Sequence, residues 1–323
     1  MSKKPKVLVV GSFVMDLIVT ANRFPNAGET VFGDGFKTVP GGKGANQAVQ
    51  AARLGADVTM VGKVGKDSFG DELIASAKES GVNTDYVFRA DNAPSAIGNV
   101  QIQKNEEGTE NRIIVVPGAN LELTLEDVAF LKDVIGDFDI VILQHEIRSD
   151  VNCFVAKIAK EAGVKVMLNP APYAPIPKEL LACLTYISPN EHEAADIAGI
   201  VLESDNDIDT AVSKIKEMGV RNVLITLGKR GCAFCDGKSK VLSGSVDCGE
   251  VIDPTAAGDS FMGAFCTAVA MGVEIESALQ FANCTAGITV TKMGAQTSLP
   301  YLKDVFAIME KNGFNTKHFE ILK

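Results

Sequence analysis

Residues 253–259 read Asp-Pro-Thr-Ala-Ala-Gly-Asp and combine a glycine turn with an acid that could act as a base. A strand-like stretch precedes them, and a helix rich in small residues is predicted to begin near Ala257. The free N–H groups of a first helical turn can hold a phosphate oxygen, and the Asp259 carboxylate could take the proton of an incoming hydroxyl. The segment therefore predicts phosphoryl transfer with Asp259 as the base. The competing interpretation is that Asp253 and Asp259 only cap the helix.

Residues 40–46, Pro-Gly-Gly-Lys-Gly-Ala-Asn, form a second glycine loop ahead of a predicted helix. The loop is not a Walker A motif, because Gly44 follows Lys43 and position 37 is a lysine. It does not contain GxGxxG either. Lys43 and Asn46 are suited to bonding sugar hydroxyls, so we expect a sugar site here; a tight turn needed only for helix packing is the alternative.

Two further segments carry polar groups at predicted strand or helix ends. If a helix begins after Pro189, Asn190 and Glu193 share a face. An amide oxygen and a carboxylate suit a Mg²⁺ ion that keeps most of its waters, although acids in a first helical turn are also common without a metal. Residues 223–231 read as a buried strand ending at Thr226 and a turn at Gly228. Ligands bind beyond the carboxyl ends of parallel strands, which favours a ligand at this turn.

The elements that must position these groups alternate along the chain. Strands are predicted at 6–10, 58–61, 139–143, 164–168, 184–187, 223–226 and 233–234. Helices are predicted at 45–54, 69–80, 150–162, 260–271 and 275–291. This alternation predicts an α/β fold with a doubly wound, mainly parallel sheet and helices on both faces. Short alternating pieces at about 13–40 and 95–116 interrupt it, and we expect them to form one small sheet that projects from a single domain spanning 1–323.

Composition narrows the function classes. The chain has 323 residues, of which 46% are hydrophobic and 22% charged, and a formal net charge of -10. This acidity argues against a nucleic-acid partner. No apolar run approaches the roughly 18 residues needed to span a bilayer, so we expect no membrane association and a cytoplasmic location. The seven cysteines include a CxxC pair, Cys232 and Cys235, without a second pair to complete a zinc site. We interpret that pair as part of a strand running into a turn.

Taken in order, these segments resemble the ribokinase-like carbohydrate kinase family, and most closely its ribokinase branch. The similarity extends over nearly the whole chain. It is carried by Gly-Ser at 11–12 with Asp16, Gly-Glu-Thr-Val at 28–31, Gly-Gly-Lys-Gly-Ala-Asn-Gln-Ala at 41–48, Asn-Pro-Ala-Pro at 169–172, residues 190–194, Ile-Thr-Leu-Gly at 225–228 and Lys-Met-Gly-Ala-Gln at 292–296.

The resemblance implies a β-sheet lid, homodimers that pair through the lids, and transfer of the terminal phosphate of ATP to the 5-hydroxyl of D-ribose. It implies that Asp259 is the base and that the amides of Ala256, Ala257 and Gly258 form the anion hole. The sugar would contact Asp16, Gly42, Lys43, Gly44, Ala45, Asn46, Glu146 and Asp259. ATP and Mg²⁺ would lie among Asn190, Glu193, Thr226, Leu227, Gly228, Lys229, Arg230, Gly231, Gly258 and Asn283. An activating K⁺ would be held by Asp253, Thr255, Thr289, Lys292, Gly294 and Ser298, several of them through backbone carbonyls.

One position departs from the family pattern. Val14 stands two residues before Asp16, where ribokinases have an asparagine and the related deoxyribokinases an apolar residue. A valine facing a sugar hydroxyl leaves it unpaired at a cost of about 1–3 kcal/mol. Val14 therefore favours 2-deoxyribose, or a sugar lacking or inverting a hydroxyl there, as the alternative substrate. The alternative is that Val14 packs in the lid hinge, and that a water molecule or Glu146 bonds the sugar hydroxyl in its place.

The sequence argues against two other function classes. A non-catalytic sugar- or nucleotide-binding regulator on the same fold would have no need of Asp259, so the presence of this acid argues against it. A dehydrogenase is suggested only by the first strand and its glycine, and the sequence lacks GxGxxG.

Overall fold

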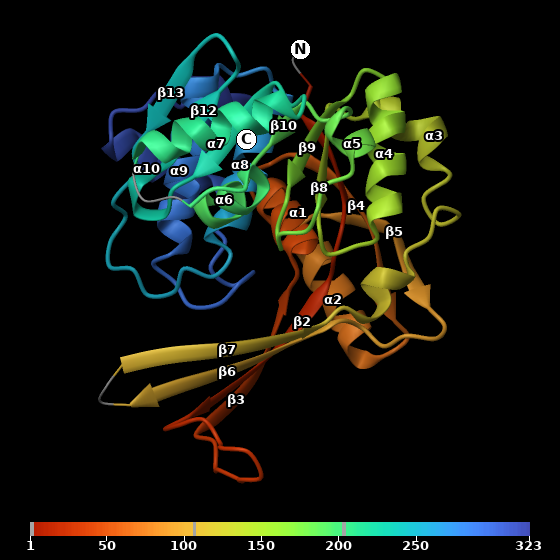
Figure 1. The fold of residues 1–323 in the computed structure, drawn as a ribbon, viewed down its shortest axis with the longest axis vertical. Helices are drawn as coiled ribbons and strands as arrows, with labels where there is room; N and C mark the ends of the chain where they lie inside the picture. The colour runs from red at the N-terminus through yellow and green to blue at the C-terminus, as the bar shows by residue number, and fades with distance from the viewer. Residues whose placement is uncertain (1–2, 106–107, 202–204) are drawn as a thin grey trace.

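The computed structural model describes residues 3–105, 108–201 and 205–323, and it contains a large and a small β-sheet (Figure 1). The large sheet has nine strands in the order β13-β12-β11-β10-β9-β8-β1-β4-β5. Its strands from β11 to β5 run parallel to their neighbours, and β12 and β13 are antiparallel additions at one edge. The strands are β1 Lys6–Val10, β4 Asp57–Gly65, β5 Asn83–Ala90, β8 Ile140–Gln144, β9 Lys165–Asn169, β10 Tyr186–Ile187, β11 Asn222–Thr226, β12 Cys232–Cys235 and β13 Lys240–Ser243.

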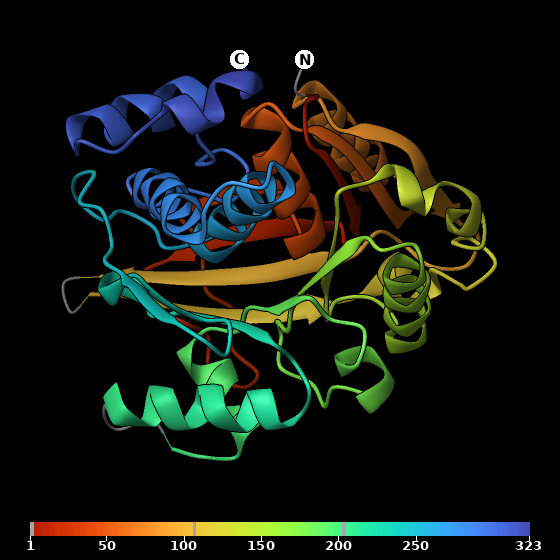
Figure 2. The same cartoon turned by 90° about the horizontal axis from the view of Figure 1, so that it is seen from above.

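Helices cover both faces of the large sheet, as Figure 2 shows from above. Successive side chains of a buried strand point to opposite faces. In β1, Val7 and Val9 accordingly belong to one core cluster, while Leu8 and Val10 belong to the other. The first cluster is covered by α1 Lys43–Arg53, α2 Ser68–Glu79, α8 Ala257–Ala270, α9 Ile275–Thr289 and α10 Leu302–Lys311. The second is covered by α3 Leu131–Val134, α4 Ser149–Glu161, α5 Lys178–Leu181, α6 Glu191–Ala198 and α7 Asp205–Glu217. The predicted doubly wound α/β class is confirmed.

The small sheet, called the lid here, projects away from the large one (Figure 1). Its order is β3-β2-β6-β7, with β2 Val14–Ala21, β3 Gly35–Gly41, β6 Ile97–Asn105 and β7 Gly108–Val116. The central pair, β2 and β6, is parallel, whereas the two outer pairs are antiparallel hairpins. The parallel pairing joins two chain segments far apart in sequence into one sheet, as the alternating patterns predicted.

Some predicted boundaries are wrong. Helix α8 begins at Ala257, as the glycine turn predicted, so the later start at 260 given with the helix ranges is wrong. Strand β10 has only two residues, Tyr186–Ile187. Strands β5 and β13 and helices α7 and α10 were not predicted. For the two strands the reason is exposure: β5 and β13 lie at the edges of the sheet, and edge strands with half-buried residues lack the continuous apolar signal of central strands.

Strand β12 resolves the interpretation of the CxxC pair. Cys232 belongs to the core cluster on one face of the sheet, and Cys235 packs against the cluster on the other. Two residues three apart in a strand point to opposite faces. The pair therefore cannot bind one metal or form a disulfide, and both thiols are free. In the described part of the chain, no helix is long and apolar enough to cross a membrane.

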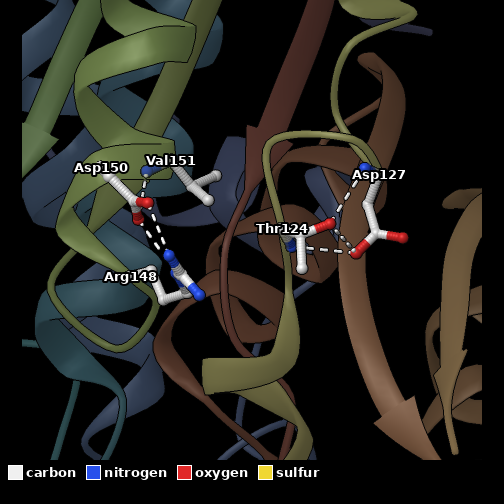
Figure 3. A network of polar contacts seen from close by, with 5 residues as sticks. All are labelled: Thr124, Asp127, Arg148, Asp150 and Val151. Atoms are coloured by element: carbon white, nitrogen blue, oxygen red, sulfur yellow. Dashed lines mark hydrogen bonds and ion pairs between the residues drawn. The ribbon is translucent and has the colours of Figure 1, made fainter.

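Polar contacts fix the chain on either side of β8 (Figure 3). Arg148 donates two hydrogen bonds to the Asp150 carboxylate, at 3.0 and 2.7 Å, where α4 begins. Earlier in the chain than β8, Thr124 donates to Asp127 through its N–H at 2.9 Å and its hydroxyl at 3.0 Å. The loop between β8 and α4 ends beside the Arg148–Asp150 ion pair, and it carries Glu146.

Candidate active site

The turn before α8 is held in an unusual backbone conformation. Ala256 is in the left-handed region at φ 61°, and it has this distinction alone among the described non-glycine residues. Such a conformation costs about 1 kcal/mol or more and is typical of functional sites. The N–H of Ala257 donates to the Pro254 carbonyl at 3.2 Å. The N–H groups of Gly258 and Asp259 have no acceptor among the described residues, so the start of α8 presents free donors.

Asp259 lies in the first turn of α8 and is 7% exposed. Its carboxylate accepts a hydrogen bond from Asn46 Nδ2 at 2.9 Å and another from Gln47 Nε2 at 3.0 Å. Both donors come from α1, and Ala256, the residue in the capping position of α8, makes no side-chain cap bond. The alternative that Asp259 only caps its helix is therefore wrong. Asp253 is not a cap of α8 either, because its oxygens accept the N–H groups of Thr255 at 2.9 Å and Gly294 at 2.8 Å.

The start of α1 is pressed against the end of β1. A Cβ on Gly44 would lie 2.5 Å from Ser12 N, and one on Gly11 would lie 3.0 Å from Gly44 Cα, so glycine is required at both positions. Gly42, at φ 94°, turns the chain into the helix. The N–H of Lys43 donates to Glu146 Oε2 at 2.9 Å. The first glycine loop thus packs closely, as the packing interpretation predicted, and it also places Asn46 against Asp259. The sugar site at Lys43 and Asn46 stays a prediction.

Glu146 receives a second, short hydrogen bond from the Ser12 hydroxyl, which in turn accepts the Gly44 N–H at 3.2 Å. Burial raises the pKa of the Glu146 carboxyl, against the opposing charge of Lys43 and the hydrogen bonds that it accepts. Ser12 was not predicted as a site residue. The signal for it was its position directly after the glycine that ends β1.

Lys43 is the cation at the centre of the site. Burial lowers the pKa of its ammonium group, but the carboxylates of Asp259, Glu146 and Glu193 outweigh that effect and raise the pKa above its ordinary value. The ammonium group therefore stays protonated at neutral pH. Three acids around one lysine leave the site with a negative balance, which suits a further cation.

Asp16 projects from lid strand β2 between two glycines. A Cβ on Gly98 would lie 2.3 Å from Asp16 Oδ1, and one on Gly41 would lie 2.9 Å from Oδ2. The carboxylate accepts no hydrogen bond from any described residue. Burial, together with the nearby Glu146 carboxylate, raises the pKa of Asp16 from 3.8 to about 6. Val14 is 6% exposed, and its Cγ1 would lie 3.7 Å from the same Cβ on Gly98, so it faces the same side of the lid sheet as Asp16.

A cavity of about 230 Å³ lies between the ends of the central strands and α8. Seven predicted site residues line it, and Asn169, Ala171, Ser188, Pro254 and Met262 were not predicted. Asn169 is the last residue of β9, at the carboxyl edge where ligands bind in parallel sheets, and this position was the available signal. The lining residues are Lys43, Asn169, Ala171, Ser188, Asn190, Glu193, Thr226, Pro254, Ala256, Gly258, Asp259 and Met262.

Asn190 and Glu193 form a capping box at the start of α6. Asn190 Oδ1 accepts the Glu193 N–H at 2.8 Å, and Glu193 Oε2 accepts the Asn190 N–H at 2.9 Å. The helix-start alternative is thus correct for this pair, although both residues also line the cavity. Burial raises the pKa of the Glu193 carboxyl against the Asn190 hydrogen bond and the Lys43 charge, and the Asp259 and Asp196 carboxylates add to the rise.

Residues 226–231 form a turn beside α6. Thr226 ends β11 and bridges to Asn190, and its N–H donates to the Pro189 carbonyl at 3.1 Å. Gly228–Arg230 form a short 3₁₀ helix, closed by a 2.8 Å hydrogen bond from Leu227 N to the Gly231 carbonyl. Lys229 and Arg230 are exposed. Of this turn, Thr226 lines the cavity.

Asn283 lies on α9, beyond this turn, and ties the helix to β13. Its Nδ2 donates to Ser243 Oγ at 2.9 Å, and the residue is 5% exposed. The side-chain nitrogen is therefore engaged in packing between elements.

The six residues assigned to a cation come from two adjoining segments. The Asp253 bond to Gly294 joins them, and the Val290 carbonyl accepts the N–H of Ile252 at 2.8 Å. Burial would raise the pKa of the Asp253 carboxyl, but its hydrogen bonds from Thr255 and Gly294 outweigh that effect and lower the pKa. Thr289 and Ser298 are buried, and their hydroxyls donate to the carbonyls of Thr285 at 3.0 Å and Ala295 at 2.7 Å. Lys292 follows Thr289 within one turn, and its N–H donates to the Thr289 carbonyl at 3.2 Å.

A buried acid, free helix N-terminal amides and a glycine loop facing them are groups that phosphoryl transfer can use, and comparison with known proteins gives the family of the chain. The family model for the pfkB family carbohydrate kinases matches residues 4–302, so the chain belongs to this family. It is 39% identical to the ribokinase of Bacillus subtilis (strain 168) over 299 residues, which cover 93% of this chain and 97% of that protein. It is 37% identical to the ribokinase of Mus musculus, with 93% of each chain covered.

A solved structure gives the same result. The fold is similar to that of Arabidopsis thaliana ribokinase complexed with ribose and ATP, with a TM-score of 0.89 and 35% identity. The match covers 95% of this chain and 99% of that chain. The predicted resemblance to the family is confirmed.

Proposed function

We propose that this protein transfers the terminal phosphoryl group of ATP to the 5-hydroxyl of D-ribose, giving ribose 5-phosphate and ADP. The observation that carries the proposal is the buried Asp259 carboxylate in the first turn of α8, next to N–H groups without acceptors. The ribokinases to which the chain is similar, one of them solved with ribose and ATP, support the choice of both substrates.

In this reaction Asp259 accepts the proton of the 5-hydroxyl as the oxygen attacks phosphorus. The negative charge that develops on the phosphoryl oxygens is stabilised by the free N–H groups at the start of α8 and by the helix dipole. Of the predicted anion hole, the N–H of Gly258 is free, whereas that of Ala257 is engaged with Pro254. We therefore assign the main donor role to Gly258, with Ala256 shaping the turn.

The sugar is assigned to the lid and the first glycine loop. Asp16 has a carboxylate without a protein donor, and Asn46 Oδ1 is buried without a partner, so each has capacity for a sugar hydroxyl. Lys43 and Glu146 add a cation and an acid at the loop. Residues Gly42, Gly44 and Ala45 let the backbone come close.

The nucleotide and Mg²⁺ are assigned to the side of the cavity formed by Thr226, Asn190 and Glu193. A buried carboxyl with a raised pKa, as at Glu193, is stabilised in its ionised form by a cation, so the residues present fit a Mg²⁺ that keeps most of its waters. Mg²⁺ would supply charge neutralisation for the phosphates. The residues assigned to ATP beyond the cavity are Leu227, Gly228, Lys229, Arg230, Gly231 and Asn283.

The segments joined by Asp253 and Gly294 fit a monovalent cation. They offer an ionised carboxylate and, at the carbonyls of a tight turn, several oxygen ligands. K⁺ bound by Asp253, Thr255, Thr289, Lys292, Gly294 and Ser298 would supply positive charge beside the turn that shapes the anion hole.

A second candidate substrate is 2-deoxyribose, and Val14 is the observation that favours it. Because Val14 faces the same side of the lid as Asp16, it offers a methyl surface next to the acid assigned to the sugar. A sugar that lacks the facing hydroxyl would lose nothing at this position.

We further propose that the chain works as one domain with the lid inserted at about 13–40 and 95–116, and as a homodimer paired through the lids. Large apolar side chains of the lid support the dimer, since Phe32 is 97% exposed, Phe36 67% and Ile114 65%. Large exposed apolar surfaces mark protein interfaces, and these side chains would contribute to one. A cytoplasmic location is also proposed, and it is supported by seven free thiols.

The test is an assay of the purified protein with ATP, Mg²⁺ and K⁺ against ribose, 2-deoxyribose, fructose, tagatose and nucleosides. We expect the highest kcat/KM with ribose, or with 2-deoxyribose if Val14 decides the choice. Asp259→Asn should abolish turnover and leave ribose binding by calorimetry largely intact. A preference for a hexose or a nucleoside, or full activity of Asp259→Asn, would refute the proposal. Equal rates with and without K⁺ would refute the cation site.

A further inference from the structure

Gln47 is a completely buried amide on α1, next to Asn46 in sequence. Both of its N–H groups and its oxygen have partners. Nε2 donates to Asp259 Oδ1 at 3.0 Å and to Asn169 Oδ1 at 3.1 Å, and Oε1 accepts a hydrogen bond from Gln144 Nε2 at 2.8 Å. Gln47 does not line the cavity, so it reaches the site only through the residues that it bonds.

The neighbours of Gln47 fix which way its amide points. Asn169 uses its Nδ2 to donate to the Ser188 carbonyl at 2.9 Å, which leaves its oxygen to face Gln47. Gln144, at the end of β8, presents its nitrogen to the Gln47 oxygen. If the amide were reversed, its oxygen would face the oxygens of Asn169 and Asp259, and its nitrogen would face a nitrogen. The amide can therefore only donate toward Asp259.

The two carboxylate oxygens of Asp259 are thus held by two different amides, Asn46 on Oδ2 and Gln47 on Oδ1. Two bonds to the two oxygens fix the plane of the carboxylate, which a single bond would not. Both donors are neutral and neither offers a proton that could neutralise the acid. A base must be held in a defined orientation toward the proton that it takes, and these two bonds supply that orientation.

We propose that Gln47 is the positioning residue of the base: it fixes the plane of the Asp259 carboxylate. Its own amide is held by Gln144 at the end of β8 and by Asn169 at the end of β9, so these two strands set the position of the base. This inference rests on the proposed function, in which Asp259 is the base. It separates the roles of two adjacent amides, since Asn46 also faces the sugar through its free oxygen and Gln47 does not.

Two variants test the role. Gln47→Met keeps a similar volume and removes both donors. We expect its kcat for phosphorylation of the sugar to fall roughly 10- to 100-fold, with little change in the KM for that sugar. Gln47→Glu keeps the shape but places a second carboxyl against Asp259. Two adjacent carboxylates do not both ionise readily, so the acid limb of the pH profile of kcat/KM should move up by about one pH unit or more.

Gln50→Met is the matched control. Gln50 is equally buried on the same helix, and its Nε2 donates to the Pro300 carbonyl at 3.0 Å, away from Asp259. We expect this variant to lose a comparable amount of thermal stability and to keep the wild-type pH profile. Circular dichroism melts of all three variants show whether each one folds. If Gln47→Met does not fold, the isosteric variant Gln47→Glu still tests the role.

The outcomes separate the inference from the function on which it rests. Failure of the wild-type protein to phosphorylate any small sugar refutes the proposed function. If the wild type is active, an unmoved pH profile in Gln47→Glu, or an equal loss of kcat in Gln50→Met and Gln47→Met, refutes the positioning role. A shifted acid limb in Gln47→Glu with a normal profile in Gln50→Met supports it.

Discussion

Replacing Asp16 by asparagine should make the protein more stable and less active. The Asp16 carboxylate is enclosed between Gly41 and Gly98, and burial with the nearby Glu146 charge raises its pKa from 3.8 to about 6. A raised pKa means that the folded protein binds the proton more tightly than the unfolded chain does, so the ionised form is a cost of folding above pH 6. Asparagine has nearly the same shape and carries no charge.

The size of the effect follows from that pKa. The rise is 6 − 3.8, or about two units. At roughly 1.4 kcal/mol per unit this is about 3 kcal/mol, and partial contact with solvent reduces it to an expected gain of about 1–2 kcal/mol for Asp16→Asn at pH 8. The sign depends on pH in a defined way. Between pH 4 and 6 the native protein holds a proton that the unfolded chain has lost, so the wild type gains stability as the pH falls through this window.

The assay is thermal unfolding of wild type and variant at pH 8, 6 and 4. We expect Asp16→Asn to melt a few degrees higher at pH 8, with the difference closing toward pH 4. Its kcat/KM for ribose should fall about 10-fold or more, because a charged hydrogen-bond acceptor is lost. Asp34→Asn, an exposed change in the same lid, is the control and should not alter the melting temperature appreciably. A variant that is less stable at pH 8, or a gain that persists unchanged at pH 4, would refute the reasoning.

Two further changes on the same face of the lid test the sugar side. Val14→Asn should raise the ratio of kcat/KM for ribose over 2-deoxyribose by about 5- to 100-fold, since it adds a partner for one hydroxyl; an unchanged ratio would contradict the assigned role. Gly98→Ala places a Cβ 2.3 Å from Asp16 Oδ1 and should raise the ribose KM at least about 10-fold by displacing the carboxylate. Gly136→Ala, whose Cβ would meet only Ala162 at 3.9 Å, should leave KM unchanged.

The sequence was sufficient to predict those strands and helices in which apolar residues follow a clear pattern. The central strands are continuous apolar runs, and the helices behind the two glycine loops have clear starts, so the large sheet and the lid were predicted. Edge elements such as β5 and β13 were missed because exposed strands contain few apolar residues and are specified by pairing with a neighbour. The start of α8 near Ala257 was predicted from the glycine turn, but the left-handed conformation of Ala256 was not, because alanine gives no signal for it in residue type.

The residues of the candidate site also fall into those that the sequence predicted and those that it did not. Groups that follow a glycine turn, such as Asp259 and Lys43, are visible in the sequence because glycine marks the close approach. The amide of Gln47 and the carboxamide of Asn169 are not, since their significance lies in a contact between residues 122 positions apart. Nor could the sequence decide whether Asp259 only caps its helix. That decision required the partners of its carboxylate, which come from another helix.

The parallel pairing of β2 and β6 has a mechanical consequence. A lid made of one hairpin would be joined to the large sheet by two chain passages, but this one is joined by four, at the start of β2, the end of β3, the start of β6 and the end of β7. Four passages side by side restrict a sheet to rotation about one axis and oppose twisting or sliding. Asp16 and Val14 lie at one of these passages, and the loop that carries Lys43 begins at another. Any rotation of the lid therefore moves the two halves of the sugar site along a single, reproducible path.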